Sequence, residues 1–396
     1  MYFGPEKIKE KRKEYLMPCL NNFYQNPPQL VRGEMQYLYD SEGKKYLDFF
    51  AGVSVMNCGH SNPYILGKVI EQLNTLQHVC NIYLTQPIVE LAEKLAKILP
   101  EDINNSFFCM SGSEAMDGAM VLARTVTNKR KFIALKNSLH GRTNLTMSAT
   151  NINMWRTDPF LNEDDFYFVS TIEEIEDILV KDAINIAGFM AEPIQGNAGI
   201  ITPELDFFEK IKVLLAKHDV LMIIDEVQTG FGRTGKMFAI EHYNVMPDII
   251  AYAKAIGNGI PMAGFSARSE IAQKFVKPSA STLGGNPVSC AAALAVLEYI
   301  DNNDLVKKSG DLGEYLLSKL KSLKHESIID VRGKGLMLGV ELKDAQKVDE
   351  VLEALKDNGI ILGKNGLQRN VLAFQPPLVI NKGDIDFLIE NLDRVL

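Results

Sequence analysis

Short runs of apolar residues alternate with longer amphipathic stretches through the middle of the chain. The runs at 106–110, 131–135, 166–169, 186–191, 221–225 and 249–251 have the length and composition of buried strands. Between them lie stretches with helical periodicity, such as 114–124 and 205–217. Strand–helix alternation at this spacing is typical of a parallel sheet covered on both faces. The pattern therefore predicts an α/β fold with a mainly parallel sheet.

The two ends of the chain follow different patterns. Residues 37–47 alternate around Glu42-Gly43 and predict a hairpin, whereas helical patterns at 288–300 and 305–323 precede hairpin-like and helical pieces up to residue 396. No repeat or low-complexity linker interrupts the chain. We expect an N-terminal segment (1–55) packed on a small α+β domain (287–396), and a large domain between them (56–286).

Composition narrows the class of protein. The 396 residues suffice for a well-buried core of two domains, and a net charge of −8 argues against nucleic acid as a partner. No apolar run approaches the length of a membrane span, and the N-terminus carries no apolar signal segment. The five cysteines form no Cys-x-x-Cys pair, which indicates neither a disulfide framework nor a metal site. We expect a reduced, cytoplasmic protein.

Lys254 is the strongest candidate for chemistry. It lies among small residues and glycines, soon after an apolar run that ends in Asp225. Pyridoxal 5'-phosphate (PLP) needs an amine that forms a Schiff base and a carboxylate that keeps the pyridine nitrogen charged. The pair therefore predicts a PLP site.

Two segments are candidates for binding the phosphate. Gly112 and Ser113 follow a predicted strand and open a predicted helix, where free amides favour an anion. Ser281 and Thr282 precede a Gly-Gly turn. Considered alone, the segment at Gly112 and Ser113 is explained better by ordinary helix capping, whereas Ser281 and Thr282 fit either role.

Two further motifs contain arginine. His140-Gly141-Arg142 places Arg142 in a glycine turn, where it is either a bidentate carboxylate clamp or a surface charge. Residues 230–236 have the glycine and lysine spacing of a P-loop. Met237 follows where magnesium coordination needs Ser or Thr, so we interpret this segment as a turn.

Together these motifs resemble the class III (ω-amino acid) aminotransferases of PLP fold-type I, and among them the acetylornithine aminotransferases. The carriers of the resemblance, in family order, are Asp225-Glu226-Val227-Gln228-Thr229-Gly230, Lys254 and Gly284-Gly285-Asn286-Pro287. The segment 333–339 resembles the family's C-terminal domain strand. The resemblance implies a large domain with a seven-stranded-type sheet and a homodimer with shared active sites.

The resemblance also implies roles. Lys254 would carry the cofactor and move a proton, and Asp225 would hold the pyridine nitrogen protonated. The other implied cofactor contacts are Gly112, Ser113, Leu139, Glu192, Glu226, Val227 and Gln228, and Thr282 would reach the phosphate of the cofactor bound by the other subunit. The implied substrate contacts are Arg142, Ser281, Val53 and Asn197. The implied reaction is transamination between N2-acetyl-L-ornithine and 2-oxoglutarate, giving the semialdehyde and glutamate, in arginine biosynthesis.

The chain departs from the family at a charged switch. Asn197 and Ala373 stand where the family has a glutamate and an arginine that pair with each other. Losing one partner would leave the other buried and unpaired, which costs several kcal/mol, whereas losing both avoids this cost. We expect altered carboxylate recognition in a working enzyme, with Arg369 as a candidate substitute.

Other departures concern the shape of the pocket. Leu139 replaces an aromatic residue that stacks on the cofactor, and Val53 leaves room for an N-acyl group. The alternatives are another ω-aminotransferase, acting on succinyl-diaminopimelate, ornithine or 4-aminobutyrate, and a non-catalytic PLP-fold sensor. A Rossmann dehydrogenase is disfavoured because no Gly-x-Gly-x-x-Gly follows the first strand.

Overall fold

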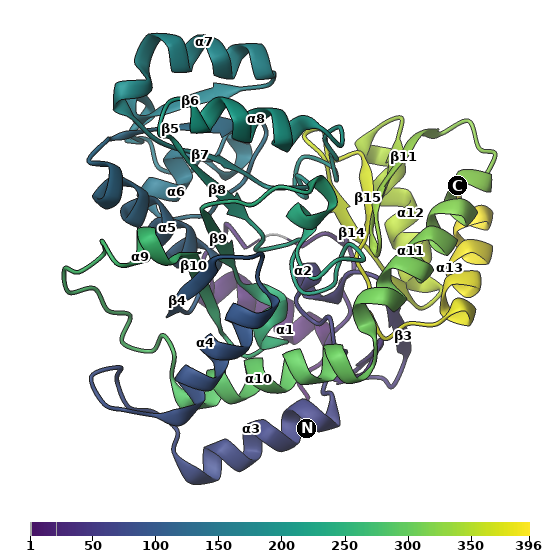
Figure 1. Ribbon diagram of the computed structural model, residues 1–396. Helices are drawn as coiled ribbons and strands as arrows, with labels where there is room; N and C mark the ends of the chain where they lie inside the picture. Colours follow the sequence, from purple (N-terminus) through teal and green to yellow (C-terminus); the bar gives the residue numbers. More distant parts are fainter. Residues whose placement is uncertain (1, 21) are drawn as a thin grey trace.

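A seven-stranded sheet forms the centre of the molecule in the computed structural model, which describes residues 2–20 and 22–396 (Figure 1). The strand order is β4-β10-β9-β8-β7-β5-β6. The strands are β4 (Ile103–Cys109), β5 (Lys131–Leu135), β6 (Phe166–Val169), β7 (Ile186–Ala191), β8 (Leu221–Asp225), β9 (Ile249–Tyr252) and β10 (Ala263–Arg268). Strands β5 to β9 pair in parallel, and β10 runs antiparallel to β4 and β9. The predicted mainly parallel α/β sheet is confirmed.

Burial explains why most of these strands were recognisable. Every residue of β7 and β9 is buried, so a continuous apolar run is the pattern that a covered parallel strand requires. Strand β10 was not predicted because small and polar residues interrupt it. Its buried Ser266 hydroxyl is satisfied by Ser106 Oγ at 2.8 Å and by the Tyr252 hydroxyl at 2.9 Å.

Two smaller sheets flank the central one. The first joins β1 (Leu30–Glu34), β2 (Tyr37–Asp40) and β3 (Lys45–Asp48) to β13 (Ile360–Ile361), which pairs in parallel with β3. The second has the order β11 (Ile328–Lys334), β12 (Met337–Leu342), β15 (Val371–Phe374) and β14 (Gly363–Asn365). The N-terminal strands therefore pair with the C-terminal part of the chain; the exact domain boundaries stay a prediction.

Two local predictions have clear outcomes. The hairpin at 37–47 is present as β2 and β3. The segment 333–339, expected as one strand, instead ends β11 and begins β12 through a tight turn at Gly335, whose φ is 54°. Glycine adopts this left-handed conformation without strain, which explains the turn.

Helices cover both faces of the central sheet (Figure 1). The helices of the described ranges are α1 (Pro5–Tyr15), α2 (Ala51–Ser54), α3 (Pro63–Thr75), α4 (Gln86–Ile98), α5 (Gly112–Thr127), α6 (Asn144–Ser148), α7 (Ile172–Asp182), α8 (Phe207–Ala216), α9 (Ser269–Ala272), α10 (Pro287–Asn302), α11 (Leu305–Ser322), α12 (Ala345–Asp357) and α13 (Lys382–Val395). Among them, α11 and α12 pack on the C-terminal strands instead of the central sheet, and α13 packs on α11 and α12. The alanine-rich α10 packs against α3 and α4. None of the helices in the described ranges combines the length and hydropathy needed to cross a bilayer.

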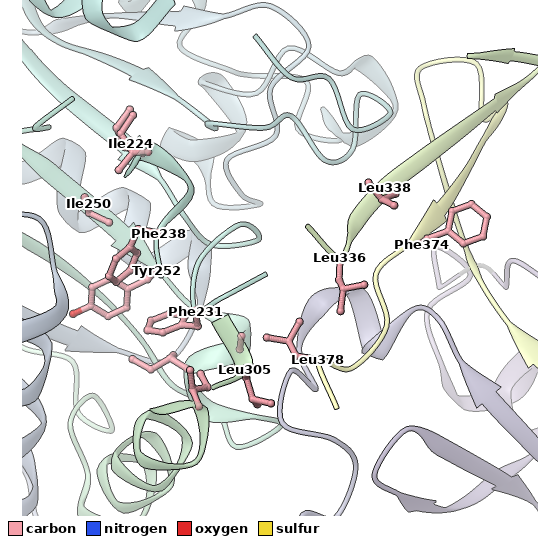
Figure 2. Packing of buried hydrophobic residues seen from close by; sticks show 14 of the residues in the cluster. Ile224, Phe231, Phe238, Ile250, Tyr252, Leu305, Leu336, Leu338, Phe374 and Leu378 are labelled. Atoms are coloured by element: carbon pink, nitrogen blue, oxygen red, sulfur yellow. The ribbon is translucent and has the colours of Figure 1, made fainter. Parts of the chain in front are cut away.

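One hydrophobic core connects the central sheet to the C-terminal sheet. Figure 2 shows Ile224, Ile250 and Tyr252 on the side of the central sheet and Leu338 and Phe374 on the C-terminal side. Between the two groups lie Phe231, Leu305, Leu336 and Leu378 (Figure 2). Continuous apolar packing of this kind fixes the two sheets relative to each other.

Candidate active site

Asp225 and Lys254 come together where neighbouring parallel strands end. Asp225 is the last residue of β8, and Lys254 follows the end of β9 by two residues, with a left-handed φ of 51°. The buried Asp225 carboxylate accepts hydrogen bonds from His140 Nδ1 at 2.7 Å and from the Val227 amide at 3.0 Å. The carboxylate is therefore held in one orientation, toward the cavity that both residues line.

The Lys254 amine is in a partly buried, acidic setting. Burial lowers the pKa of Lys254, and the negative charges of Asp225 and Glu192 oppose this effect. Within residues 2–20 and 22–396, the amine has no hydrogen-bond or ion-pair partner. A lowered pKa increases the neutral fraction of the amine, which is the nucleophilic and basic form.

The N-terminus of α5 forms one wall of the cavity. Gly112 and Ser113 are its first residues, and Ser111 caps the helix by accepting the Glu114 amide at 3.2 Å. A Cβ atom at Gly112 would lie 2.9 Å from Val227 Cγ1, so any larger residue would push into Val227. Ser113 Oγ accepts the Arg142 amide at 3.0 Å. Close backbone approach and free amides at a helix N-terminus suit a phosphate group.

A cavity of about 360 Å³ collects most of the predicted cofactor contacts. The predicted residues that line it are Gly112, Ser113, Leu139, Glu192, Asn197, Asp225, Val227, Gln228 and Lys254. Its other walls include Val55, Met110, His140, Ile260, Pro261 and Met262. The residues that line the cavity thus come from parts of the chain as far apart as Val55 and Met262.

Five predicted residues lie outside this lining. Arg142 and Thr282 are exposed, Ser281 and Val53 are half-buried, and Glu226 is fully buried. Glu226 turns away from the cavity: it accepts the Ile240 amide at 2.8 Å and the Thr229 hydroxyl. The direct contacts implied for these residues stay predictions.

Glu192 is a buried carboxyl group inside the cavity. One oxygen accepts the Leu139 amide at 2.9 Å and the other accepts the Gly196 amide at 3.2 Å. Burial raises the pKa of Glu192 to about 7, with opposing effects from His140 and from the two amides. The group therefore changes charge near neutral pH, next to the lysine and the aspartate.

The two substituted switch positions have different surroundings. Asn197 lines the cavity, whereas Ala373 is fully buried in a small apolar cluster with Ile194, Ile200 and Met337. Ala373 also lies between Gly339 of β12 and Gly363 of β14. Two residues of the loop around Asn197 thus belong to the same apolar cluster as Ala373, and the space around position 373 is apolar.

Two functional neighbours were missed from the sequence. His140 was noted only as part of a motif, yet its ring holds Asp225; its Nε2 atom is buried without a partner among the described residues. Gln375 reaches from the end of β15 to Gln228, accepting its Nε2 at 3.3 Å. Pairings between side chains so far apart in sequence leave no local signal.

The residues present fit PLP. Glycine at 112 keeps a cradle open at the helix N-terminus, since a side chain there would collide with Val227. The buried Asp225 has a partner on each oxygen but faces the cavity, and the Lys254 amine is free to react. When bound, PLP supplies an electron sink for the reacting carbon of an amino substrate. Lys254 would hold it, Asp225 would keep a proton on its ring, and Gly112 and Ser113 would bind its phosphate.

Comparison with known proteins agrees with this geometry. Residues 22–396 match the family described as aminotransferase class-III. The chain is 40% identical to the acetylornithine aminotransferase of Aquifex aeolicus, covering 96% of this chain and 100% of the relative. It is 39% identical to the mitochondrial alanine–glyoxylate aminotransferase 2 homolog 2 of Arabidopsis thaliana, covering 99% and 88%. The crystal structure of acetylornithine aminotransferase from Elizabethkingia anophelis superimposes with a TM-score of 0.87 at 31% identity, covering 100% and 99%.

These matches extend over nearly the whole chain and include the segments that build the cavity. The similarity therefore applies to the fold and to the reaction class, since the site residues lie within the matched range. The protein belongs to the class III aminotransferases and is a PLP-dependent transaminase.

Proposed function

We propose that this transaminase moves the distal amino group of N2-acetyl-L-ornithine to 2-oxoglutarate, giving the semialdehyde and glutamate, as in arginine biosynthesis. The observation that carries the proposal is the full-length similarity to acetylornithine aminotransferases, 40% identical in the case of Aquifex aeolicus. The cavity wall also contains the aliphatic side chains of Leu139 and Val55, which suit the carbon chain of such a donor.

Lys254 and Asp225 would have different roles in the reaction. Lys254, with its pKa lowered by burial, would act as the base that removes a proton from the reacting carbon of the substrate and as the acid that gives a proton back. Asp225, oriented by His140, would keep the ring nitrogen of bound PLP protonated, so that the ring can accept electron density from the reacting carbon.

A second candidate is transamination between alanine and glyoxylate. The similarity to the Arabidopsis thaliana relative, 39% identical, favours it. So does the apolar packing of Ala373, since small monocarboxylic substrates have no second carboxylate that needs a switch arginine there.

A half-reaction screen separates the two candidates. The PLP form is titrated with one amine at a time, and loss of the absorbance of the bound cofactor is followed. We expect N2-acetyl-L-ornithine to react at least tenfold more efficiently than alanine, ornithine, succinyl-diaminopimelate or 4-aminobutyrate. Alanine as the best donor would establish the second candidate, and no reaction with any amine would favour the non-catalytic alternative.

The active enzyme is proposed to be a homodimer in the cytoplasm. Large apolar side chains are exposed on the single chain, among them Met17, Ile82, Tyr83 and Leu84, as expected of a surface that a second copy covers. Thr282 is also exposed, although the glycines beside it pack tightly on Phe108 and Ile88. All five cysteines are free, which supports a reducing compartment.

Subunit mixing tests the shared site. Lys254→Ala and Thr282→Ala subunits, each inactive alone, should together restore one intact site in each heterodimer. Heterodimers that form but recover no activity would contradict a contribution of Thr282 to the partner subunit's site.

A further inference from the structure

Four consecutive residues after Phe50 adopt the left-handed backbone conformation. Their φ angles are 52° at Ala51, 60° at Gly52, 68° at Val53 and 59° at Ser54, and together they make up α2. The conformation is unfavourable for L-residues, and most of all for a β-branched residue such as Val53. A strained backbone of this kind persists only where neighbouring groups hold it. This left-handed turn, residues 51–54, therefore requires specific support.

An aspartate–histidine pair supports the start of the left-handed turn. Asp48 Oδ1 accepts the Phe50 amide at 2.7 Å and the Ala51 amide at 2.9 Å. The other carboxylate oxygen, Oδ2, lies 2.6 Å from His60 Nε2. Only 1% of Asp48 is exposed, so water has little access to Oδ2 in place of the histidine. His60 therefore fixes the carboxylate that holds the turn.

His60 is itself fixed in place. Its amide donates to the Met35 carbonyl at 2.7 Å, and its carbonyl accepts the Met35 amide at 2.8 Å. Its side chain packs directly on Gly33, where an added Cβ atom would lie 2.7 Å from His60 Cβ. The imidazole therefore has one defined position beside Asp48.

The segment before His60 is attached to the turn that carries Lys254. Asn258 directly follows the short helix Lys254–Gly257. Its side chain accepts the Cys58 amide and donates to the Gly59 carbonyl, both at 2.9 Å. The histidine is thus placed relative to the reactive lysine as well as to the left-handed turn.

The left-handed turn ends at the cavity. The Ala51 carbonyl accepts the Val55 amide at 2.8 Å and the Met56 amide at 3.0 Å. Val55 lines the cavity together with Lys254. Met56 packs behind Gly259, another lining residue, since a Cβ atom there would lie 3.1 Å from Met56 Sδ. The position of Val55 in the cavity wall therefore depends on the turn and on the aspartate–histidine pair that supports it.

We infer that His60 is a positioning residue for donor specificity: through Asp48 and the left-handed turn, it holds Val55 where the carbon chain of a long amino donor binds. The donor class is an amino acid whose reacting amino group lies at the end of a chain of several carbons. The inference rests on the proposed function, which supplies N2-acetyl-L-ornithine as that donor. Lys254 and Asp225 are positioned by the ends of central strands, so the chemical step should not depend on the pair.

Donor kinetics and hydrogen exchange of the holoenzyme test this inference. His60→Leu should raise KM for N2-acetyl-L-ornithine about fivefold or more and leave kcat within about twofold. KM for alanine should change about twofold or less, because alanine has no long chain for Val55 to contact. The Val55 amide should exchange about tenfold faster or more, since the turn that holds it is released. His60→Gln should restore all of these values to within about twofold, because its side-chain amide can donate to Asp48.

Two further variants locate the effect. In a Val55→Ala background, His60→Leu should no longer change KM for the long donor, because the side chain through which it acts is gone. His242→Leu is the matched control: it removes the hydrogen bonds of another half-buried histidine, to Thr234, and should change neither KM nor exchange of the Val55 amide.

Gly52→Ala keeps the inference testable if His60→Leu folds poorly. The added Cβ atom would meet only Val55 Cβ, at 3.9 Å, so it acts by disfavouring the left-handed conformation and not by collision. KM for the long donor should rise about two- to fivefold with kcat unchanged. In an active enzyme, the inference is overturned if KM stays unchanged in both variants, or if KM changes while exchange of the Val55 amide does not. A wild-type enzyme that does not react with N2-acetyl-L-ornithine overturns the proposed function, and the inference with it.

Discussion

The two ends of the cavity are built in different ways. The cofactor end is formed by Asp225 and Lys254 at the ends of adjacent buried strands and by the first turn of α5. The end where we propose that the substrate binds is formed by turns, namely the loop around Asn197 and the left-handed segment that leads to Val55. The rigid sheet holds Asp225 and Lys254 in fixed positions. Turns tolerate sequence changes more easily than buried strands, so the residues that recognise the substrate can vary.

The largest effect is expected at the cofactor end. Lys254→Ala should reduce turnover by roughly a thousandfold or more, because it removes both the attachment point and the proton-transferring amine. Cofactor should still bind through the α5 N-terminus. Borohydride reduction of the wild-type protein followed by peptide mapping should find the adduct on Lys254. Lys217→Ala, an exposed lysine at the end of α8, serves as control, and an adduct on another lysine would contradict the assignment.

A smaller but selective effect is expected at Asp225. Asp225→Asn should lower turnover by about 10²–10³-fold while cofactor affinity falls much less, since the carboxylate stabilises charge that develops in the transition state. His140→Asn should show a weaker version of the same split, because His140 acts through its 2.7 Å bond to Asp225. Equal losses of affinity and turnover would indicate that the aspartate only maintains the fold.

At the substrate end, a charge placed at position 373 should disturb packing. Ala373→Arg buries a cation among Ile194, Ile200 and Met337 and should cost about 3–5 kcal/mol in the free energy of unfolding. Adding Asn197→Glu should recover about 1–3 kcal/mol, measured as the coupling energy of a double-mutant cycle in denaturant unfolding.

The control for this prediction places the same charge in the turn between β14 and β15. Leu367→Arg adds the same charge at an exposed position near Arg369 and should change stability by less than about 0.5 kcal/mol. Strict additivity of the changes at 197 and 373 would mean that the two side chains do not meet, and would contradict our account of the lost switch.

The same division explains how far the sequence could be interpreted. Strands β5 to β9 are continuous apolar runs, so their positions and the carboxylate at the end of β8 follow from local patterns. Gly112 and Ser113 are also recognisable, because a strand followed by glycine and a helix is a local signature. Strand β10 was not predicted, because Gly264 and Ser266 interrupt its apolar residues.

Contacts between distant parts of the chain could not be predicted in the same way. The contact of Gln228 with Gln375 joins residues 147 positions apart, and His140 reaches Asp225 across 85 positions. The stack of Arg369 on Phe23 joins the two ends of the chain. Such contacts depend on how separate sheets are docked, and no local period in the sequence reports this. Resemblance to the family supplied part of what local patterns lack.

The smallest effect is expected at two buried glutamates, one of which lines the cavity while the other lies behind its wall. Burial raises the pKa of both Glu192 and Glu226 to about 7, but only Glu192 lines the cavity. In each case the folded protein keeps the proton to a higher pH than the unfolded chain does. The stability that this provides is present below about pH 4.5 and is lost as the pH rises through about 7. Glu192→Gln and Glu226→Gln should each remove part of this decline, on the order of 1–3 kcal/mol in pH-dependent unfolding.

Activity distinguishes the two glutamates. Only Glu192→Gln should also alter the pH dependence of turnover near pH 7, because Glu192 lies beside Lys254 and affects its charge. Glu226→Gln is the matched control, since it has the same shift and the same burial but bonds to Ile240 and Thr229. If both variants change the pH dependence of turnover equally, the charge of Glu226 also affects the groups in the cavity, although Glu226 does not line it. The rigid cofactor end would then include the segment that Glu226 supports.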